Sequence, residues 1–210
     1  MKLIYVYDAL CGWCYGFSPV IKKFVATYKN EIKIEIISGG MITGDRIGPI
    51  GEVASYISWA YKNVEEATSV KFGTNFLDKT LKSGTAIFTS IPVAIALSIV
   101  KSKIPEQSLA FAEALQKAIY FDGIEPNNLK EFAKLSENFG LNKSEFLNDM
   151  ANENYKILAE VDFRKSQNLN VSGFPTVFIE LDDQYYKIAS GFTSFENLEK
   201  SYLQIKTIKK

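Results

Sequence analysis

The sequence predicts an α/β protein in which a strand–helix–strand unit comes first and a strand–strand–helix unit comes last. A long helical segment lies between them. Strand-like runs of aromatic and β-branched residues occur only near the two ends, whereas apolar residues recur every three or four positions through the middle. The 210 residues, 47% of them hydrophobic, are enough for one core with an inserted subdomain. No linker-like stretch separates two domains in series.

Three short sequence patterns predict the N-terminal strand–helix–strand unit. Residues 3–7 are apolar and aromatic, which suits a buried strand. Phe17, Ile21, Phe24 and Tyr28 then recur at helical spacing, and residues 32–36 alternate between isoleucine and charged residues. A strand, a helix and a strand within about 37 residues form a βαβ unit, so the two strands should be parallel.

The middle of the chain is predicted to be helical from residue 44 to residue 168. Pro92 can occupy the first turn of a helix that is apolar on nearly every side through Val100, and Gly123 and Gly140 are plausible helix stops. Two further helices are expected at 144–150 and 153–168. Three apolar stripes at helical spacing support the remaining helices: Val53, Ile57, Ala60 and Val64; Leu109, Ala112, Leu115 and Ile119; Leu129, Phe132, Leu135 and Phe139.

Strand character returns near the C-terminus. Residues 176–181 and 185–189 flank a turn at 182–184 and form an antiparallel hairpin, which a helix at 194–205 follows. We therefore predict a discontinuous α/β domain of residues 1–43 and 169–210, interrupted by an all-helical insertion subdomain of residues 44–168.

The composition excludes several function classes. Without any histidine, the chain has no Ser-His-Asp or Cys-His catalytic group, and two cysteines cannot complete a four-ligand zinc site, so we expect no metal. Twenty-four basic residues balance 24 acidic ones, which predicts neither nucleic-acid nor membrane binding. The apolar stretch after Lys2 is too short for a signal-peptide core, so we expect a soluble, cytoplasmic protein.

The two cysteines form the pair Cys11-Gly12-Trp13-Cys14 where the first strand ends and the first helix begins. This spacing lets the sulfurs meet, and a helix N-terminus stabilises a thiolate through its unpaired N–H groups and its dipole. Because the thiolate is the attacking species in disulfide exchange, Cys11 is the predicted nucleophile and Cys14 the resolving thiol. The chain would then need no cofactor besides its own redox-active disulfide.

Two neighbours of the pair have alternative interpretations. Asp8, three residues before Cys11, could accept the Cys14 proton during turnover, but a helix cap or turn carboxylate is the stronger interpretation. Trp13 could flank bound substrate or could equally cover core surface.

Three segments carry a resemblance to a known family. YDALCGWCYGF at 7–17, FAEALQKAIYFDG at 111–123 and VSGFPTVFIE at 171–180 resemble the DsbA-like branch of the thioredoxin superfamily. Within it, the FrnE-type proteins, regarded as cytoplasmic protein-disulfide isomerases, are the most similar. The resemblance implies a thioredoxin fold with a helical insertion. It also implies that Pro175 is a cis-proline lying against the cysteine pair, and that the Phe174 backbone pairs with an extended substrate peptide.

The dipeptide between the cysteines bears on the direction of electron flow. The exported oxidant DsbA carries Pro-His there, whereas Gly12-Trp13 offers no histidine to stabilise the Cys11 thiolate. We therefore expect a reductase or isomerase that acts on protein or peptide disulfides, with glutathione as a candidate co-substrate. Two alternatives remain open: a glutathione-dependent transferase or isomerase of the kappa or hydroxychromene-carboxylate type, and a non-catalytic thioredoxin-like binding module.

Overall fold

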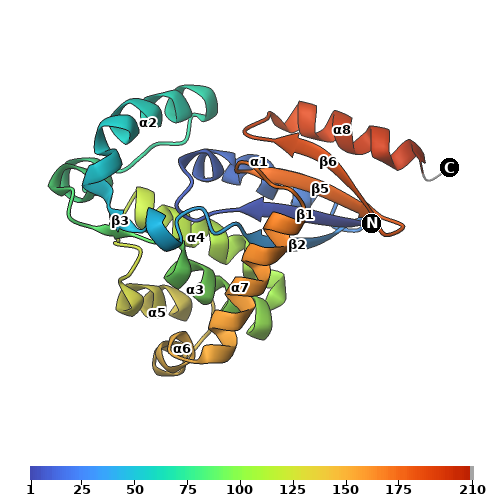
Figure 1. Cartoon of the computed structure of the whole chain (residues 1–210). Coiled ribbons are helices and arrows are strands. Elements are labelled where there is room, and N and C mark those ends of the chain that lie inside the picture. The colour runs from blue at the N-terminus through green and yellow to red at the C-terminus, as the bar shows by residue number, and fades with distance from the viewer. Residues whose placement is uncertain (209–210) are drawn as a thin grey trace.

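The structure, a computed structural model, describes residues 1–208 and is built around one four-stranded sheet (Figure 1). The strand order is β2-β1-β5-β6, formed by β1 (Lys2–Tyr7), β2 (Lys33–Ser38), β5 (Thr176–Leu181) and β6 (Gln184–Ser190). β1 runs parallel to β2 and antiparallel to β5, and β5 and β6 form the predicted hairpin. The first and last parts of the chain therefore share one sheet, as the sequence predicts.

β1 is one of the two inner strands of the sheet, and both of its faces are apolar. Leu3, Tyr5 and Tyr7 pack into the large core that also contains α1, whereas Ile4 and Val6 join a smaller cluster on the opposite face. A strand that is buried on both faces reads as a continuous apolar run, and the sequence of β1 is such a run.

One face of the sheet is covered by α1 (Gly12–Thr27) and α8 (Phe195–Ile208), which lie above it in Figure 1. α1 continues through Pro19, which cannot donate to the carbonyl of Tyr15. The Ser18 hydroxyl donates to that carbonyl instead, at 3.1 Å. The last helix of the insertion, α7 (Glu153–Asn168), packs against β2.

The insertion contains the predicted helices with small shifts at their ends. Pro92 lies in the first turn of α3, which is buried along most of its length, as predicted. The sequence patterns missed η3 (Asn75–Leu81), a π-helical segment without simple 3.6-residue periodicity. The helices are α2 (Ala54–Thr68), α3 (Ser90–Lys103), α4 (Ser108–Tyr120), α5 (Leu129–Glu137), α6 (Lys143–Met150) and α7 (Glu153–Asn168). Short 3₁₀ turns, η1 (Gly44–Arg46), η2 (Ile50–Val53) and η4 (Pro105–Gln107), connect them.

The prediction of an all-helical insertion is wrong in one detail. β3 (Gly48–Pro49) and β4 (Ile87–Phe88) pair as a short antiparallel ribbon beside α2. Strands of two residues are too short to show an alternating pattern, so the sequence could not reveal them. The subdomain boundaries at residues 43 and 168 stay predictions.

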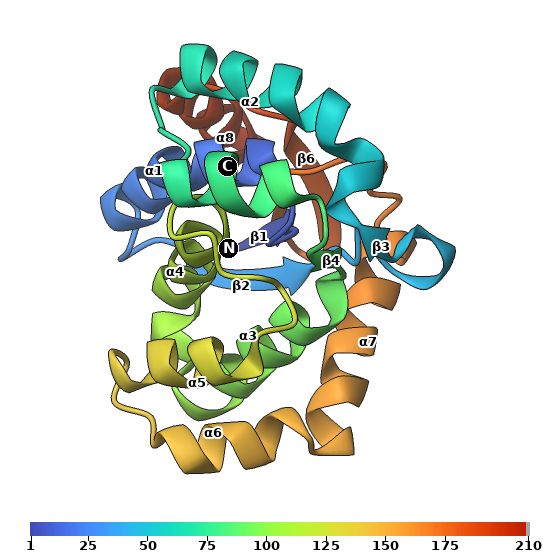
Figure 2. The same cartoon turned by 90° about the vertical axis from the view of Figure 1, so that its left-hand side faces the viewer.

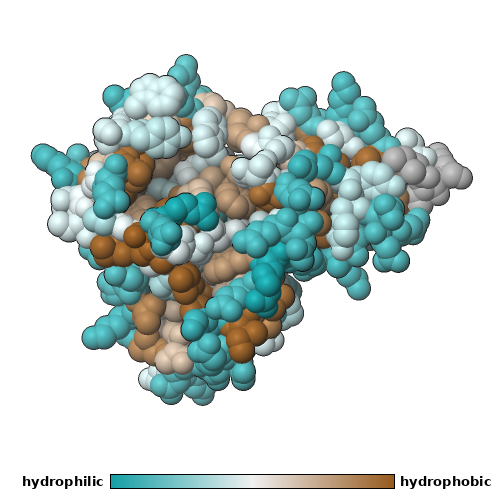
Figure 3. All heavy atoms as spheres, in the orientation of Figure 1, coloured by the Kyte–Doolittle hydropathy of each residue, from teal (hydrophilic) through white to brown (hydrophobic). Residues whose placement is uncertain are grey.

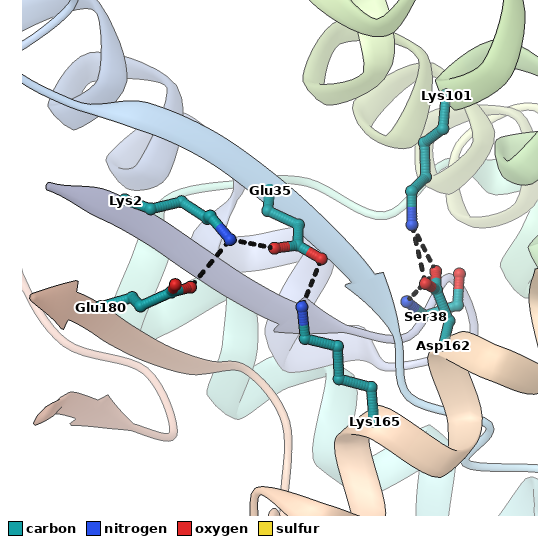
Figure 4. Close-up of polar contacts among 7 residues, drawn as sticks. All are labelled: Lys2, Glu35, Ser38, Lys101, Asp162, Lys165 and Glu180. Carbon is teal, nitrogen blue, oxygen red and sulfur yellow. Dashed lines mark hydrogen bonds and ion pairs between the residues drawn. The ribbon is translucent and has the colours of Figure 1, made fainter. Parts of the chain in front are cut away.

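Two ion-pair groups attach α7 to the sheet and to α3 (Figure 4). Glu35 on β2 pairs with Lys2 on β1 at 3.1 Å and with Lys165 on α7 at 2.6 Å. Asp162 on α7 binds Lys101 on α3 through both carboxylate oxygens, at 2.7 and 2.8 Å, and accepts the Ser38 N–H at the end of β2 at 3.0 Å. The end of β2 is thus fixed to α7, just before the chain passes Gly39 and Gly40 toward the cysteine pair.

Candidate active site

Cys11 is the N-cap residue of α1, as its position after β1 and a short turn predicts. Its sulfur accepts the Cys14 N–H at 3.3 Å and lies 3.5 Å from the Phe174 carbonyl, to which the thiol can donate. The Cys11 side chain is 6% exposed, and it lines a cavity that is described below. The predicted nucleophile therefore sits at a helix N-terminus, where backbone donors favour a negatively charged sulfur.

Cys14 lies one helical turn deeper and is fully buried. Burial raises the pKa of the Cys14 thiol well above its ordinary value, and its contact with Cys11 raises it further. Both cysteines are unbridged in this structure. A sulfur that solvent does not reach can react with its partner sulfur far more readily than with an external disulfide, which is the arrangement a resolving thiol requires.

The loop before β5 lies directly against the pair. The Phe174–Pro175 peptide bond is cis, which agrees with the sequence-based expectation. The Phe174 ring fills the space over Gly39, where an added Cβ would come within 2.1 Å of the ring. Pro175 is buried, and its carbonyl accepts the Gly191 N–H at 2.7 Å. These contacts fix the Phe174 carbonyl beside the Cys11 sulfur.

Asp8 is buried behind the pair, and both of its carboxylate oxygens are occupied. One oxygen accepts the Leu10 N–H at 2.9 Å and the Ser90 hydroxyl at 3.0 Å, and the other accepts the Met41 N–H at 2.8 Å. Burial raises the pKa of Asp8 above its usual value, while these hydrogen bonds act to lower it. The geometry matches a turn carboxylate that joins β1 to the insertion, the stronger of the two interpretations of the sequence.

An apolar cavity of about 280 Å³ opens beside Cys11, between the start of α1 and α2. In Figure 2, α2 crosses over α1, and Figure 3 shows apolar residues gathered in the hollow below it. Among the described residues, those that line the cavity include no charged side chain: Leu10, Cys11, Gly12, Trp13, Met41, Ile42, Val53, Tyr56, Ile57, Ala60, Tyr61, Val64, Phe72, Phe88 and Tyr120. The reactive sulfur is therefore one wall of an uncharged pocket.

Sequence reasoning missed the residues of α2 that form this pocket. Val53, Ile57, Ala60 and Val64 were predicted as a helix stripe, which they are, but the stripe faces the cavity rather than a closed core. Tyr56 and Trp59 are 62% and 64% exposed, with their rings 6.4 Å apart. This exposure of two aromatic residues on one helix is visible only in the folded structure, so the sequence held no signal for the cavity.

Trp13 packs against the protein and also borders the cavity, and its role beside bound substrate stays a prediction. Its ring packs against Phe192 with centroids 6.0 Å apart, and it also lines the cavity next to Cys11. Of the predicted site residues, Cys11 and Trp13 line the cavity, and Cys14 and Asp8 are buried. The Phe174–Pro175 loop lies against the Cys11 sulfur, which is 3.5 Å from the Phe174 carbonyl.

Residues 1–208 contain neither a candidate metal-ligand cluster nor a candidate membrane-spanning helix. No group of three or more His, Cys, Asp or Glu side chains in this range could hold a metal ion. None of the helices in the same range is both long and apolar enough to cross a membrane.

The fold and the paired thiols at a helix N-terminus define a thiol–disulfide oxidoreductase of thioredoxin type. Family comparison gives the finer placement: residues 2–203 match the DSBA-like thioredoxin domain, and the chain belongs to that family. A search of curated proteins found no significant match.

Solved structures with the same fold cover nearly the whole chain. A candidate protein disulfide isomerase from Nitrosomonas europaea is 25% identical with a TM-score of 0.86, covering 98% of this chain and 97% of its own. The cytosolic disulfide reductase DsbM from Pseudomonas aeruginosa is 24% identical with a TM-score of 0.82, covering 100% and 99%. A second DsbM structure, with glutathione, is 22% identical with a TM-score of 0.80 and covers 100% of both chains. A 2-hydroxychromene-2-carboxylate isomerase is 15% identical with a TM-score of 0.65, covering 100% and 95%.

Proposed function

We propose that this protein reduces or isomerises disulfide bonds in polypeptides, with Cys11 as the attacking thiol and Cys14 as the resolving thiol. The observation that carries the proposal is the position of the two sulfurs: Cys11 opens into the apolar cavity, and Cys14 is sealed behind it. Cys11 would attack a substrate disulfide and release one substrate thiol. Cys14 would then attack Cys11, release the second thiol and leave the enzyme disulfide, so two electrons pass to the substrate.

The cavity supports a polypeptide substrate. A volume of about 280 Å³ has room for a bulky apolar side chain, and burying such a side chain is worth about 1.5 to 3 kcal/mol. Glutathione carries two carboxylates and an ammonium group, for which the lining offers no charged partner. We infer that the residue next to the substrate cysteine is a large apolar one, and that the Phe174 carbonyl region and Pro175 contact the substrate backbone.

The surroundings of Cys11 support the reducing or isomerising direction. Its two hydrogen-bond partners are backbone groups of Cys14 and Phe174, and neither carries a positive charge. Strong oxidants of this superfamily owe their potential to a stabilised reduced form. Because no residue in the described range 1–208 gives the Cys11 sulfur a cationic hydrogen-bond partner, the disulfide state is relatively favoured and the dithiol gives up electrons more readily.

Glutathione is the reductant that we propose for the Cys11–Cys14 disulfide. The support is the DsbM structure with glutathione, a protein of the same fold. DsbM is described as cytosolic, which also supports the proposal that this protein works in the cytoplasm. The glutathione-transferase and chromene-isomerase alternative is less well supported, because Cys11 and Cys14, which interact through their side chains, provide a complete exchange couple without a bound glutathione.

The direction of electron flow is tested by the reduction potential, measured at equilibrium with glutathione buffers of defined ratio. We expect a value between about −200 and −270 mV, the range of glutaredoxins and thioredoxin. A value near about −120 mV, the scale of the strong oxidant, would contradict the reducing direction.

The roles of the two cysteines are tested by trapping. Cys14→Ser should accumulate mixed disulfides on Cys11 that release their polypeptide partners on reduction, whereas Cys11→Ser, the matched control, should trap none. Adducts that persist in Cys11→Ser and vanish in Cys14→Ser would reverse the assignment.

A further inference from the structure

The tyrosine at the centre of β1 lies directly beneath the resolving cysteine. Tyr5 is 2% exposed, and its ring packs between Tyr7 and Phe17, with centroids 5.6 and 5.9 Å away. Phe17 follows Cys14 by three residues on α1, so both side chains lie on the face of the helix that covers β1. Tyr5 and Cys14 therefore belong to the same packed core between β1 and α1.

The Tyr5 hydroxyl is an unused donor at this place. It is buried, and it has no hydrogen-bond partner among residues 1–208. An unpaired buried polar group is unfavourable, so its presence in a packed core calls for an explanation. Cys14 is the candidate acceptor, because it lies on the face of α1 that packs over Tyr5. Negative charge at Cys14 would raise the pKa of Tyr5.

We propose that Tyr5 donates a hydrogen bond to the Cys14 thiolate and thereby makes the resolving step possible at neutral pH. The proposal rests on the proposed function, since it concerns the second half of the exchange. When the mixed disulfide is resolved, the Cys14 S–H bond is lost, a Cys14–Cys11 S–S bond forms and the bond from Cys11 to the substrate sulfur breaks. The proton lost by Cys14 ends on the released substrate thiol, and Tyr5 keeps its own proton throughout.

The environment of Cys14 makes such a donor necessary. Burial raises the pKa of Cys14 well above its ordinary value, so few molecules carry the thiolate at neutral pH. The nearest carboxylate, Asp8, adds a repelling negative charge. The other titratable groups around Cys14 are Cys11 on α1, Tyr7 on β1 and Tyr120 on α4, none of which is a cation.

Tyr5 is suited to donate because it remains protonated. Burial raises the pKa of Tyr5 well above its usual value, and negative charge at Cys14 and Cys11 raises it further. The hydroxyl is therefore protonated at neutral pH and can donate a hydrogen bond there. A buried carboxylate in its place would lose its proton and repel the thiolate.

The test uses reduced full-length protein and dithiobis(nitrobenzoate), whose thiolate product is coloured. The first coloured equivalent is released when Cys11 attacks the reagent, and the second is released when Cys14 resolves the adduct. Stopped-flow absorbance therefore measures each cysteine separately in one experiment. The variant is Tyr5→Phe, which removes only the unpartnered hydroxyl and should leave the fold intact.

Tyr5→Phe should change only the second phase of dye release, in which Cys14 resolves the adduct. Loss of a hydrogen bond to a charged sulfur should shift the pH midpoint of this phase upward by about one to two units. Because a more basic thiolate is also a better nucleophile, the second phase at pH 7 should slow by about three- to fifteenfold rather than by the full shift. Above the midpoint of the variant, Tyr5→Phe should equal or exceed the wild type.

The control variant is Tyr7→Phe, a hydroxyl deletion on the same face of β1, which should leave the second phase of dye release within about twofold of the wild type. A second phase that is unchanged by Tyr5→Phe at every pH would overturn the inference while leaving the proposed function intact. Equal slowing of both phases would also overturn it, because the hydroxyl would then act on the site as a whole. A wild type that releases one equivalent only would refute the resolving role of Cys14, and with it both proposals.

Discussion

Removing Lys101 should leave a buried negative charge between α3, α7 and the end of β2. Asp162 is held by Lys101 at 2.7 and 2.8 Å and by the Ser38 N–H at 3.0 Å (Figure 4). The side chains of Lys101 and Asp162 are 25% and 8% exposed. In Lys101→Met the carboxylate keeps only the backbone donor.

The magnitude follows from this burial. Breaking a fully buried pair by removing one partner is unfavourable by about 3 to 5 kcal/mol, and partial exposure of Lys101 reduces the loss because water already screens the pair. We expect the free energy of unfolding to fall by about 2 to 3 kcal/mol at neutral pH. For a chain of this size, the melting temperature should drop by about 4 to 12 °C.

The pH dependence has a defined sign. Burial raises the pKa of Asp162 above its ordinary value, and Lys101 acts against this rise, so the variant should have a still higher pKa. A group whose pKa is raised in the folded state stabilises the protein at low pH, and this stability is lost as the pH rises through the folded-state pKa. The deficit of Lys101→Met should therefore be largest near pH 7 and should shrink on acidification.

Denaturant unfolding of the wild type and Lys101→Met at several pH values measures this deficit. Adding Asp162→Asn to Lys101→Met removes the charge, keeps an acceptor for Ser38 and should recover most of the loss. A deficit below about 0.5 kcal/mol, typical of a surface substitution, would refute the reasoning, and so would a deficit that is independent of pH.

Three further predictions concern the site. Gly39→Ala places a Cβ within 2.1 Å of the Phe174 ring, so the free energy of unfolding should fall by about 1 to 3 kcal/mol and disulfide exchange at Cys11 should slow. The control is Gly173→Ala, which has open space around it and should be neutral. Asp8→Asn leaves the backbone N–H of either Leu10 or Met41 unpaired, so the free energy of unfolding in denaturant should fall by about 1 to 3 kcal/mol. The rate at which Cys14 resolves the mixed disulfide should stay within tenfold of the wild type. A hundredfold slower rate would instead identify Asp8 as a proton acceptor. Ala60→Trp should fill the cavity and slow reduction of apolar peptide disulfides about tenfold or more, but not of glutathione disulfide. Lys62→Trp on the same helix is its control, and equal slowing of both substrates would argue against the cavity as the peptide site.

Much of the fold could be predicted because the apolar pattern of several segments matches the burial of those segments in the structure. β1 reads as a buried strand and is one, and α3, apolar on nearly every side, is buried along most of its length. The β5–β6 hairpin turns at Asp182 and Asp183, both with positive φ, which short acidic residues tolerate better than most.

The parts that could not be predicted depend on contacts between distant residues. The ribbon of β3 and β4 joins segments about 40 residues apart and is too short to leave a pattern. The Val53 to Val64 stripe predicts a helix, but nothing in its spacing shows that the helix borders a cavity. Tyr5 reads as an ordinary core aromatic, because its unpaired hydroxyl appears only when α1 is placed over β1.

The placement of Cys14 directly behind Cys11 also determines how the site responds to peroxide. Oxidation of Cys11 gives a sulfenic acid, which is damaged irreversibly if a second oxidant molecule reaches it. Cys14, whose N–H already lies 3.3 Å from the Cys11 sulfur, is positioned to condense with that acid, releasing water and forming the same disulfide that turnover produces. The reductant that acts in normal turnover would then reduce this disulfide and restore the two thiols, without a separate repair enzyme.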